Sequence, residues 1–445
     1  MSFDNIQNTL NSPNGIYPPI ITPELEVLAP AGDFEKLRYA LAFGADAVYA
    51  GMPQFSLRAR ENGFTSLEDI RQGIEYCHGR GKKFYLAANI IPHNNKIRTY
   101  RNALDEICSE YKPDALIMTD PGMIQYVLKN HKNTEVHLSV QGNCTNWSTA
   151  EFWYDLGVKR MILSRELRLR EIIDIRENVP GVELEVFVHG AICMAHSGRC
   201  LLSNYMSYRD ANQGACSNAC RFDYKLYAKN TPQSPDYVPL EGEFFLEEQG
   251  NKEQGLMGID EDEYGTYIMN SKDMCAIGVL DKLREAGVCS FKIEGRTKSI
   301  YYLSQIVKSY RGATDDVMAD REISSEHIDN ALKTDSRGYM AGYFVAPGEL
   351  PQNYTSTRVV SQTGTVAAIF RGYDAESKIA TISVKGQFSE GDTLELSTPT
   401  RTEMIVAQNL VNHRREKVTV LNPGLDNCKI YMEQDPGEYA FLIRK

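Results

Sequence analysis

The sequence lacks an apolar run long enough to cross a membrane, which needs about 18 consecutive apolar residues. Its N-terminus, MSFDNIQNTLNSPNGIYPPIITPELE, has neither the basic start nor the apolar stretch of a secretory signal. The motifs Gly-x-Ser-x-Gly and His-Glu-x-x-His are also absent, so neither common hydrolase signature is indicated. We therefore expect a cytoplasmic protein with no membrane partner.

Length and composition are those of an ordinary globular enzyme. The chain has 445 residues, 42% of them hydrophobic and 24% charged, which predicts two or three domains. A net charge of -11 argues against a protein that coats nucleic acid indiscriminately, although a local basic patch would still suit RNA.

Four of the ten cysteines fall within residues 193–220, here called the cysteine segment: Cys193, Cys200, Cys216 and Cys220. In a reducing cytosol, clustered thiols hold a metal more often than they form disulfides. The segment lacks the two Cys-x2-Cys knuckles of structural zinc, so its irregular gaps favour an iron-sulfur cluster. Zinc and unligated buried cysteines remain as alternatives, and Cys275 is a fifth candidate ligand. The others are predicted to be small core residues, Cys144 being the one that follows a strand end: Cys77, Cys108, Cys144, Cys289 and Cys428.

Short apolar runs alternate with amphipathic stretches such as FEKLRYALAFG and SLEDIRQGIEYCHGRG, whose glycines are typical of helix ends. Eight such alternations predict an α/β fold, a (β/α)8 TIM-like barrel, with a doubly wound open sheet as the alternative. The predicted strands are residues 25–32, 45–51, 83–90, 115–120, 135–142, 160–167, 184–190 and 289–295.

Polar residues at the strand ends are candidates for catalysis or binding, because enzymes of this fold keep their sites at the carboxyl end of the strands. We call this end the mouth. A cap or a buried ion pair is an equally good interpretation of any one of them. Together, their guanidinium and ammonium groups suit an anionic small molecule or a phosphate. The candidates are Arg58, Arg60, Asn89, His93, Asp120, Gln141, Arg165, Glu166, His189, Lys292, Glu294 and Arg296.

Sequence order also places the cysteine segment at the mouth, since it begins three residues after His189 and Gly190, at the end of the seventh strand. We expect a lead-in over residues 1–24, the barrel over 25–345 with a solvated Pro- and Glu-rich insertion at about 225–270, and an antiparallel β-barrel domain over 355–445. Within that last domain the basic stretch NHRREK (412–417) suits either RNA phosphate or a charged strand edge.

Three long stretches resemble one known family: LAPAGDFEKLRYALAFGADAVYAG, EVFVHGAICMAHSGRCLLSNYMSYRDANQGACSNACRFDY and FKIEGRTKS. They are similar, over roughly residues 25–440, to the collagenase-like peptidases of family U32, whose catalytic class is unknown. The length and the C-terminal β domain look most like the members that form 5-hydroxyuridine at the wobble position of tRNA. This resemblance implies an RNA-modifying hydroxylase that takes its oxygen from prephenate rather than from molecular oxygen.

The resemblance also implies a 4Fe-4S cluster on the cysteines of the SGRC and GxCxxxC motifs, which here are Cys193, Cys200, Cys216 and Cys220. Some relatives replace one of the four by a cysteine elsewhere, so Cys275 stays an alternative to Cys220. Implied partners are tRNA, a small anionic co-substrate and the iron-sulfur assembly machinery. Peptidase activity and hydroxylation of a small aromatic metabolite are the alternative functions. We expect the basic mouth to bind the dicarboxylate prephenate.

Overall fold

The computed structural model describes residues 24–57, 62–193, 195–214, 216–217, 220, 227–229, 237–239, 244–247, 256–262, 265–267, 272–336, 338–344 and 364–444. Apart from Glu24, the predicted lead-in over residues 1–24 lies outside these residues, as do Arg58 and Arg60. None of the described helices is both long enough and apolar enough to cross a bilayer.

Eight parallel strands close into a barrel, and each falls on one of the apolar runs that predicted it. The hydrogen-bonded order β14-β1-β2-β3-β4-β5-β6-β7 is completed by pairing between β14 and β7. This closed ring confirms the (β/α)8 prediction over the open sheet. The strands are β1 (Glu26–Pro30), β2 (Ala47–Gly51), β3 (Lys83–Ala88), β4 (Ala115–Met118), β5 (Glu135–Leu138), β6 (Arg160–Ile162), β7 (Glu183–Ala191) and β14 (Val288–Ile293).

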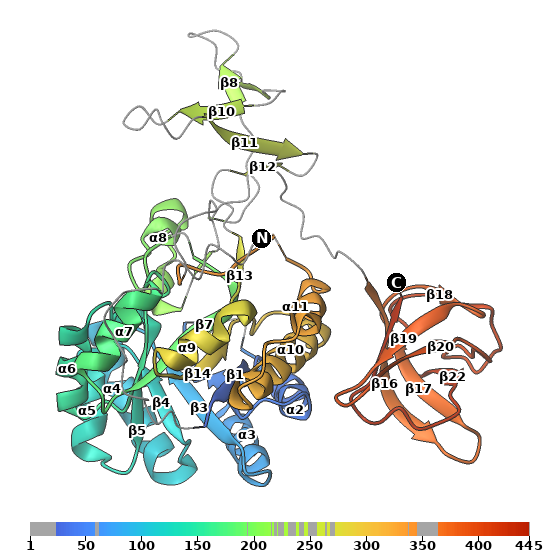
Figure 1. Cartoon of the computed structure of the whole chain (residues 1–445), viewed down its shortest axis with the longest axis horizontal. Coiled ribbons are helices and arrows are strands. Elements are labelled where there is room, and N and C mark those ends of the chain that lie inside the picture. The colour runs from blue at the N-terminus through green and yellow to red at the C-terminus, as the bar shows by residue number, and fades with distance from the viewer. Residues whose placement is uncertain are drawn as a thin grey trace. The chain divides into compact units, whose positions relative to one another are not determined.

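Helices follow the strands and lie outside the ring (Figure 1). Asp33 begins α2 (Phe34–Ala42) because its side chain accepts a hydrogen bond from the backbone N–H of Lys36. Ser66 and Asp69 form a capping box at the start of α3 (Leu67–His78). Gly44, with φ +108°, follows α2 where the sequence predicted a glycine stop. The remaining helices of the barrel region are α4 (Ile97–Glu106), α5 (Pro121–Asn130), α6 (Trp147–Leu156), α7 (Leu169–Asn178), α9 (Leu280–Glu285), α10 (Ile300–Met318) and α11 (Ser325–Leu332).

Between β7 and β14 the chain makes a long excursion that carries the cysteine segment and α8 (Leu202–Ser207). It returns through β13 (Asp273–Cys275), which pairs antiparallel with β7 and parallel with β15 (Tyr339–Met340). The insertion predicted as a solvated stretch contains short antiparallel strands. Two pair as β8 (Tyr227–Lys229) with β9 (Tyr237–Pro239), and three form the sheet β10 (Phe244–Glu247), β11 (Leu256–Asp262) and β12 (Gly265–Tyr267).

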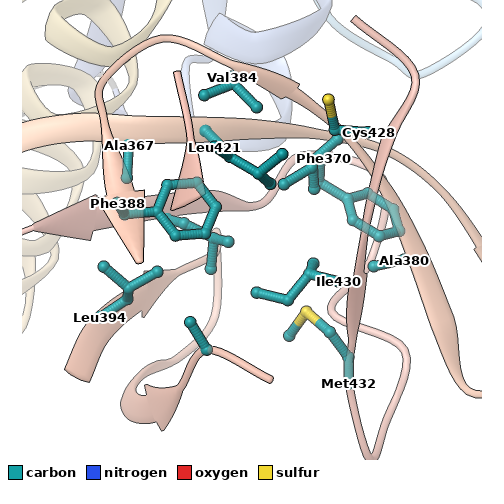
Figure 2. Packing of buried hydrophobic residues seen from close by; sticks show 14 of the residues in the cluster. Ala367, Phe370, Ala380, Val384, Phe388, Leu394, Leu421, Cys428, Ile430 and Met432 are labelled. Atoms are coloured by element: carbon teal, nitrogen blue, oxygen red, sulfur yellow. The ribbon is translucent and has the colours of Figure 1, made fainter. Parts of the chain in front are cut away.

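The C-terminal domain is an antiparallel half-barrel whose six-stranded sheet has the order β20-β19-β23-β16-β17-β22. Its hydrophobic core includes Phe370, Phe388, Leu394 and Ile430 (Figure 2). A pair of two-residue strands, β18 (Phe388–Ser389) and β21 (Val420–Leu421), lies outside the main sheet. The strands of the sheet are β16 (Thr365–Asp374), β17 (Ile379–Val384), β19 (Thr393–Ser397), β20 (Thr402–Val406), β22 (Cys428–Tyr431) and β23 (Phe441–Arg444).

The basic stretch 412–417 of this domain forms a tight turn rather than a strand. Val411 and Lys417 pair across it, and the Asn412 side chain accepts hydrogen bonds from the backbone N–H groups of Arg414 and Glu416. The Arg414 and Arg415 side chains are exposed.

Candidate active site at the mouth of the barrel

Asn89, directly after β3, forms hydrogen bonds with several loops of the mouth. Its Oδ1 accepts a hydrogen bond from the backbone N–H of Leu57 at 3.2 Å, and its Nδ2 donates to Ser139 Oγ at 3.4 Å. Its carbonyl accepts from the Thr119 hydroxyl at 3.1 Å. Asn89 therefore connects the segments that follow β2, β3, β4 and β5. Asp120, another predicted site residue, caps α5 instead, since its side chain accepts from the backbone N–H of Met123 at 3.0 Å.

The cysteine segment lies across the mouth. Its His196 ring contacts Asn143 after β5 at 3.1 Å, and the Ser197 backbone N–H donates to Glu166 after β6 at 2.6 Å. Toward its other end, Asn212 accepts from the backbone N–H of Ile91 after β3 at 3.1 Å. The sequence order predicted this position, because the segment starts where β7 ends.

Two glycines allow the segment to approach the barrel loops closely. Gly198, with φ +72°, lies so near the backbone of Gln141 that a Cβ would come within 2.2 Å of that carbonyl oxygen. Gly214, with φ +84°, makes the same kind of approach to Ser56, where a Cβ would lie 2.6 Å from the carbonyl oxygen. No other residue fits these positions without displacing backbone. The close contact thus fixes the segment against the loops after β2 and β5.

Arg165 is a predicted mouth cation that contacts the end of β7, two residues before this segment begins. Its Nη1 donates to the carbonyl of Ala191 at 2.6 Å, and its guanidinium lies 3.9 Å from the centroid of the Phe187 ring. Within the part of the chain that the structure describes, no carboxylate pairs with this half-buried guanidinium. A positioned, partly desolvated guanidinium next to the cysteine segment suits a carboxylate or phosphate ligand.

Lys292, in contrast, lies inside the barrel. Its Nζ donates to Glu185 Oε1 at 2.7 Å and lies 4.5 Å from the centroid of the Tyr49 ring, and both charged side chains are buried. The other oxygen of Glu185 accepts from Arg160 at 3.2 Å. Lys292 therefore neutralises a carboxylate below the mouth, because it occupies an inward-facing position of β14 one residue before that strand ends.

The ion network continues toward the amino end of the strands. Arg160 donates to Glu26 Oε1 at 2.7 Å, and Glu26 also accepts from the hydroxyls of Ser290 at 2.7 Å and Tyr85 at 2.6 Å. Two carboxylates thus face two cations in the buried interior, with their oxygens hydrogen-bonded, as a low dielectric requires.

Sequence reasoning missed Glu26, Arg160 and Glu185. The alternation of side chains along a strand was the available signal. Each of the three residues lies near the start of an otherwise apolar run, at a position whose side chain faces the interior. Burial by itself would raise the pKa of Glu185, but the cations of Lys292 and Arg160 hold that pKa below its ordinary value.

The remaining predicted residues take different positions. His189 is buried in β7 opposite Cys275 of β13, with its ring centroid 5.4 Å from that of Tyr339. Glu294 donates its backbone N–H to the carbonyl of His189 at 2.9 Å. The Arg296 carbonyl accepts from Lys36 Nζ at 3.1 Å, and His93 lies 3.9 Å from Asp210.

Burial divides the ten cysteines as the sequence predicted. The five that were assigned to the core are buried, and the five candidate ligands are exposed or partly exposed. Burial raises the pKa of the thiols of Cys77 and Cys144 to about 12 and of Cys108 and Cys289 to about 11. Such thiols stay protonated at neutral pH and are poor metal ligands.

The candidate ligands suit a thiolate-bound cluster in type and number. Cys193, Cys200, Cys216 and Cys220 belong to one segment at the mouth, and Cys275 is paired with the strand from which that segment emerges. Among the described residues, no three His, Cys, Asp or Glu side chains are gathered into a metal site. Thiolate sulfur is a donor that both zinc and iron-sulfur clusters use, so these side chains suit either kind of site in chemical type.

Fold and site together define a (β/α)8-barrel protein whose mouth is covered by a cysteine-bearing segment. The chain matches peptidase family U32 over residues 32–352 and the C-terminal domain of that family over residues 362–444. The chain therefore belongs to peptidase family U32.

Three relatives of this chain carry names that describe different activities. The chain is 42% identical over 442 residues to "tRNA hydroxylation protein P" of Haemophilus influenzae, covering 94% of this chain and 96% of that protein. It is 30% identical over 416 residues to "Collagenase" of Porphyromonas gingivalis, covering 89% and 92%. It is 33% identical over 297 residues to "23S rRNA 5-hydroxycytidine C2501 synthase" of Escherichia coli, covering 67% of this chain and 40% of that protein.

Proposed function

We propose that this protein hydroxylates the wobble uridine of tRNA to 5-hydroxyuridine, with prephenate as the oxygen source and a 4Fe-4S cluster at the mouth of the barrel. The observation that carries the proposal is the cysteine segment lying over the mouth beside Arg165. The names of two relatives, one a tRNA hydroxylation protein and one a 5-hydroxycytidine synthase, support RNA hydroxylation. The protein would then act in the cytoplasm, where tRNA is found.

In this proposal Cys193, Cys200, Cys216 and Cys220 hold the cluster, with Cys275 as the alternative to Cys220. Delivery of the cluster makes the iron-sulfur assembly machinery a partner. A bound cluster supplies one-electron redox chemistry at the mouth. The buried thiols take no part, because their raised pKa keeps them protonated.

Arg165 binds a carboxylate of prephenate in this scheme. The ring of Phe187 and the carbonyl of Ala191 fix the guanidinium, so its planar fork is oriented before the ligand arrives. The co-substrate is thereby held next to the cysteine segment. Lys292 and Glu185 support the barrel wall below the site and do not contact the ligand, because they are paired with each other.

Titration of the purified protein with prephenate tests this role. We expect Arg165→Met to weaken prephenate binding about tenfold or more, the loss of one charge-assisted contact. The matched control is Arg170→Met, an exposed arginine on α7 that pairs with Asp174. Equal affinity of wild type and Arg165→Met for prephenate would show that Arg165 does not bind it.

The function itself is tested by deleting the gene and digesting total tRNA into nucleosides. We expect 5-hydroxyuridine and its derivatives to disappear and to return with the wild-type gene. Cys216→Ser should fail to restore them and should lower bound iron, whereas Cys77→Ala, at a buried core cysteine, should restore both.

Peptidase activity is the second candidate, favoured by the relative named collagenase. Cleavage of collagen or casein should then survive loss of all four cysteines of the segment and vanish with one nucleophile substitution. Unchanged tRNA nucleosides in the deletion strain, together with such cleavage, would replace the hydroxylase proposal by the peptidase one.

A further inference from the structure

Helix α8 and the residue that follows it present an unusual group of exposed aromatic side chains. Tyr205 is 80% exposed and Tyr208 is 94% exposed, and Leu201 and Met206 are exposed beside them. Large apolar side chains at such exposure add nothing to the core, and a cluster of them marks an interaction surface. The cluster lies within the cysteine segment, between Cys200 and Cys216.

The backbone around Tyr208 is held in place although its conformation is an uncommon one. Tyr208 has φ 53° and ψ 24°, a left-handed conformation that bulky side chains seldom adopt. The Ser203 hydroxyl donates to the Arg209 carbonyl at 2.8 Å and accepts from the backbone N–H of Ser217 at 2.9 Å, and both serines are buried. This serine clamp holds the backbone that follows Tyr208, while the Tyr208 ring is exposed to solvent. Uncommon backbone geometry that the surroundings impose is concentrated at functional sites.

Two arginines flank the tyrosines along the chain. The Arg199 and Arg209 side chains are exposed, and neither forms an ion pair with any residue that the structure describes. The nearby carboxylate of Asp210 is engaged, since it accepts from the backbone N–H of Asn212 at 2.9 Å. Two exposed rings with two guanidinium groups are complementary to an oligonucleotide, whose bases stack on aromatic rings and whose phosphates bind arginine.

The position of this surface matches a substrate that must reach the mouth. The segment that carries it contacts the loops after β3, β5 and β6 through Asn212, His196 and Ser197. Bases that are read by stacking must be unpaired, which selects the loops of a folded RNA over its duplex stems.

We propose that Tyr205 and Tyr208 stack on unpaired bases of an RNA loop while Arg199 and Arg209 bind its phosphates. This inference rests on the proposed function, because it identifies how the same site recognises its RNA. This surface binds an RNA loop in preference to a duplex. The hydroxylation itself takes place at the mouth of the barrel.

Binding of the full-length protein, purified without oxygen, to a fluorescent tRNA anticodon stem-loop tests the proposal by anisotropy. We expect Tyr208→Ala and Tyr205→Ala each to weaken RNA binding about 5- to 100-fold, which corresponds to the loss of one stacking contact. Tyr208→Phe should bind as wild type does. A fully paired RNA of the same length should bind weakly and be insensitive to these substitutions.

Two further variants separate recognition from folding. Tyr208→Gly removes the ring and suits the left-handed backbone, so it should unfold at the wild-type temperature or above while still losing RNA affinity. Phe152→Ala removes an aromatic ring that is 59% exposed on α6 and should leave RNA binding unchanged.

The outcomes are distinct for the two proposals. A wild-type protein that binds no stem-loop and alters no tRNA refutes the proposed function. A wild-type protein that binds the stem-loop as tightly as Tyr208→Ala and Tyr205→Ala do refutes the stacking surface alone. Loss of gelatin binding, rather than RNA binding, in the two tyrosine variants would assign the surface to a polypeptide instead.

Discussion

Replacing Lys292 by methionine removes one partner of a buried ion pair inside the barrel. Its Nζ lies 2.7 Å from Glu185, and loss of a partner from such a pair costs about 3–5 kcal/mol because a charge is left buried without compensation. Glu185 still accepts from Arg160 at 3.2 Å. We therefore expect Lys292→Met to lower the free energy of unfolding by about 3 kcal/mol, the lower end of that range.

A double-mutant cycle measures the interaction between Lys292 and Glu185 directly. Glu185→Leu should cost about 3–5 kcal/mol, since Lys292 loses its carboxylate while Arg160 keeps Glu26 and Glu183. The variant with both substitutions should lie within about 2 kcal/mol of wild type, because an apolar pair of similar volume replaces the ion pair. The coupling energy between the two positions should then be at least about 4 kcal/mol.

Urea unfolding followed by tryptophan fluorescence measures this cycle in the intact protein. Both tryptophans of the chain, Trp147 and Trp153, lie in α6, so the signal reports the barrel and not the C-terminal domain. If the double variant is as unstable as the sum of the two single variants, the two charges do not interact as the structure places them.

The same variants predict the response to acid. The pKa of Glu185 is held below its ordinary value, so the stability that it contributes is complete above the unfolded carboxyl pKa and is lost as the pH falls through the lower folded value. Lys292→Met removes one of the cations responsible, so its acid unfolding should begin at higher pH than that of wild type. An acid transition at the same pH in both proteins would contradict this origin of the shift.

Three further outcomes follow from the described packing. Gly198→Ala should speed proteolytic nicking of the cysteine segment, because its Cβ meets a backbone oxygen, whereas Gly81→Ala, with φ +65° and open space around it, should not. Phe388→Ala should destabilise the C-terminal domain by about 3–5 kcal/mol, seen as faster amide exchange in β16; unchanged exchange would remove Phe388 from the core (Figure 2). In metal-free protein, maleimide should label Cys193 within minutes and leave Cys77 unlabelled until unfolding, and equal rates would contradict their different burial.

The barrel could be predicted from the sequence because its signals are local. Each strand is a short apolar run and each helix carries its own caps, such as Asp33 before α2 and Ser66 before α3. The side on which the cysteine segment lies also followed from chain order, since parallel strands bring their carboxyl ends to one face. Even the division of the cysteines into core residues and candidate ligands came from spacing along the chain.

What the chain determined by itself was therefore the sequence of elements and the residue types at their ends. Only the tertiary structure decided which charges meet. Lys292 and Glu185 are more than a hundred residues apart in sequence, and their pairing depends on β14 closing the ring against β7. The backbone that follows Tyr208 is likewise held by the serine clamp, in which Ser203 bonds to both Arg209 and Ser217. Such contacts carry no periodic signal, because they arise from closure in space and not from the pattern of any single element.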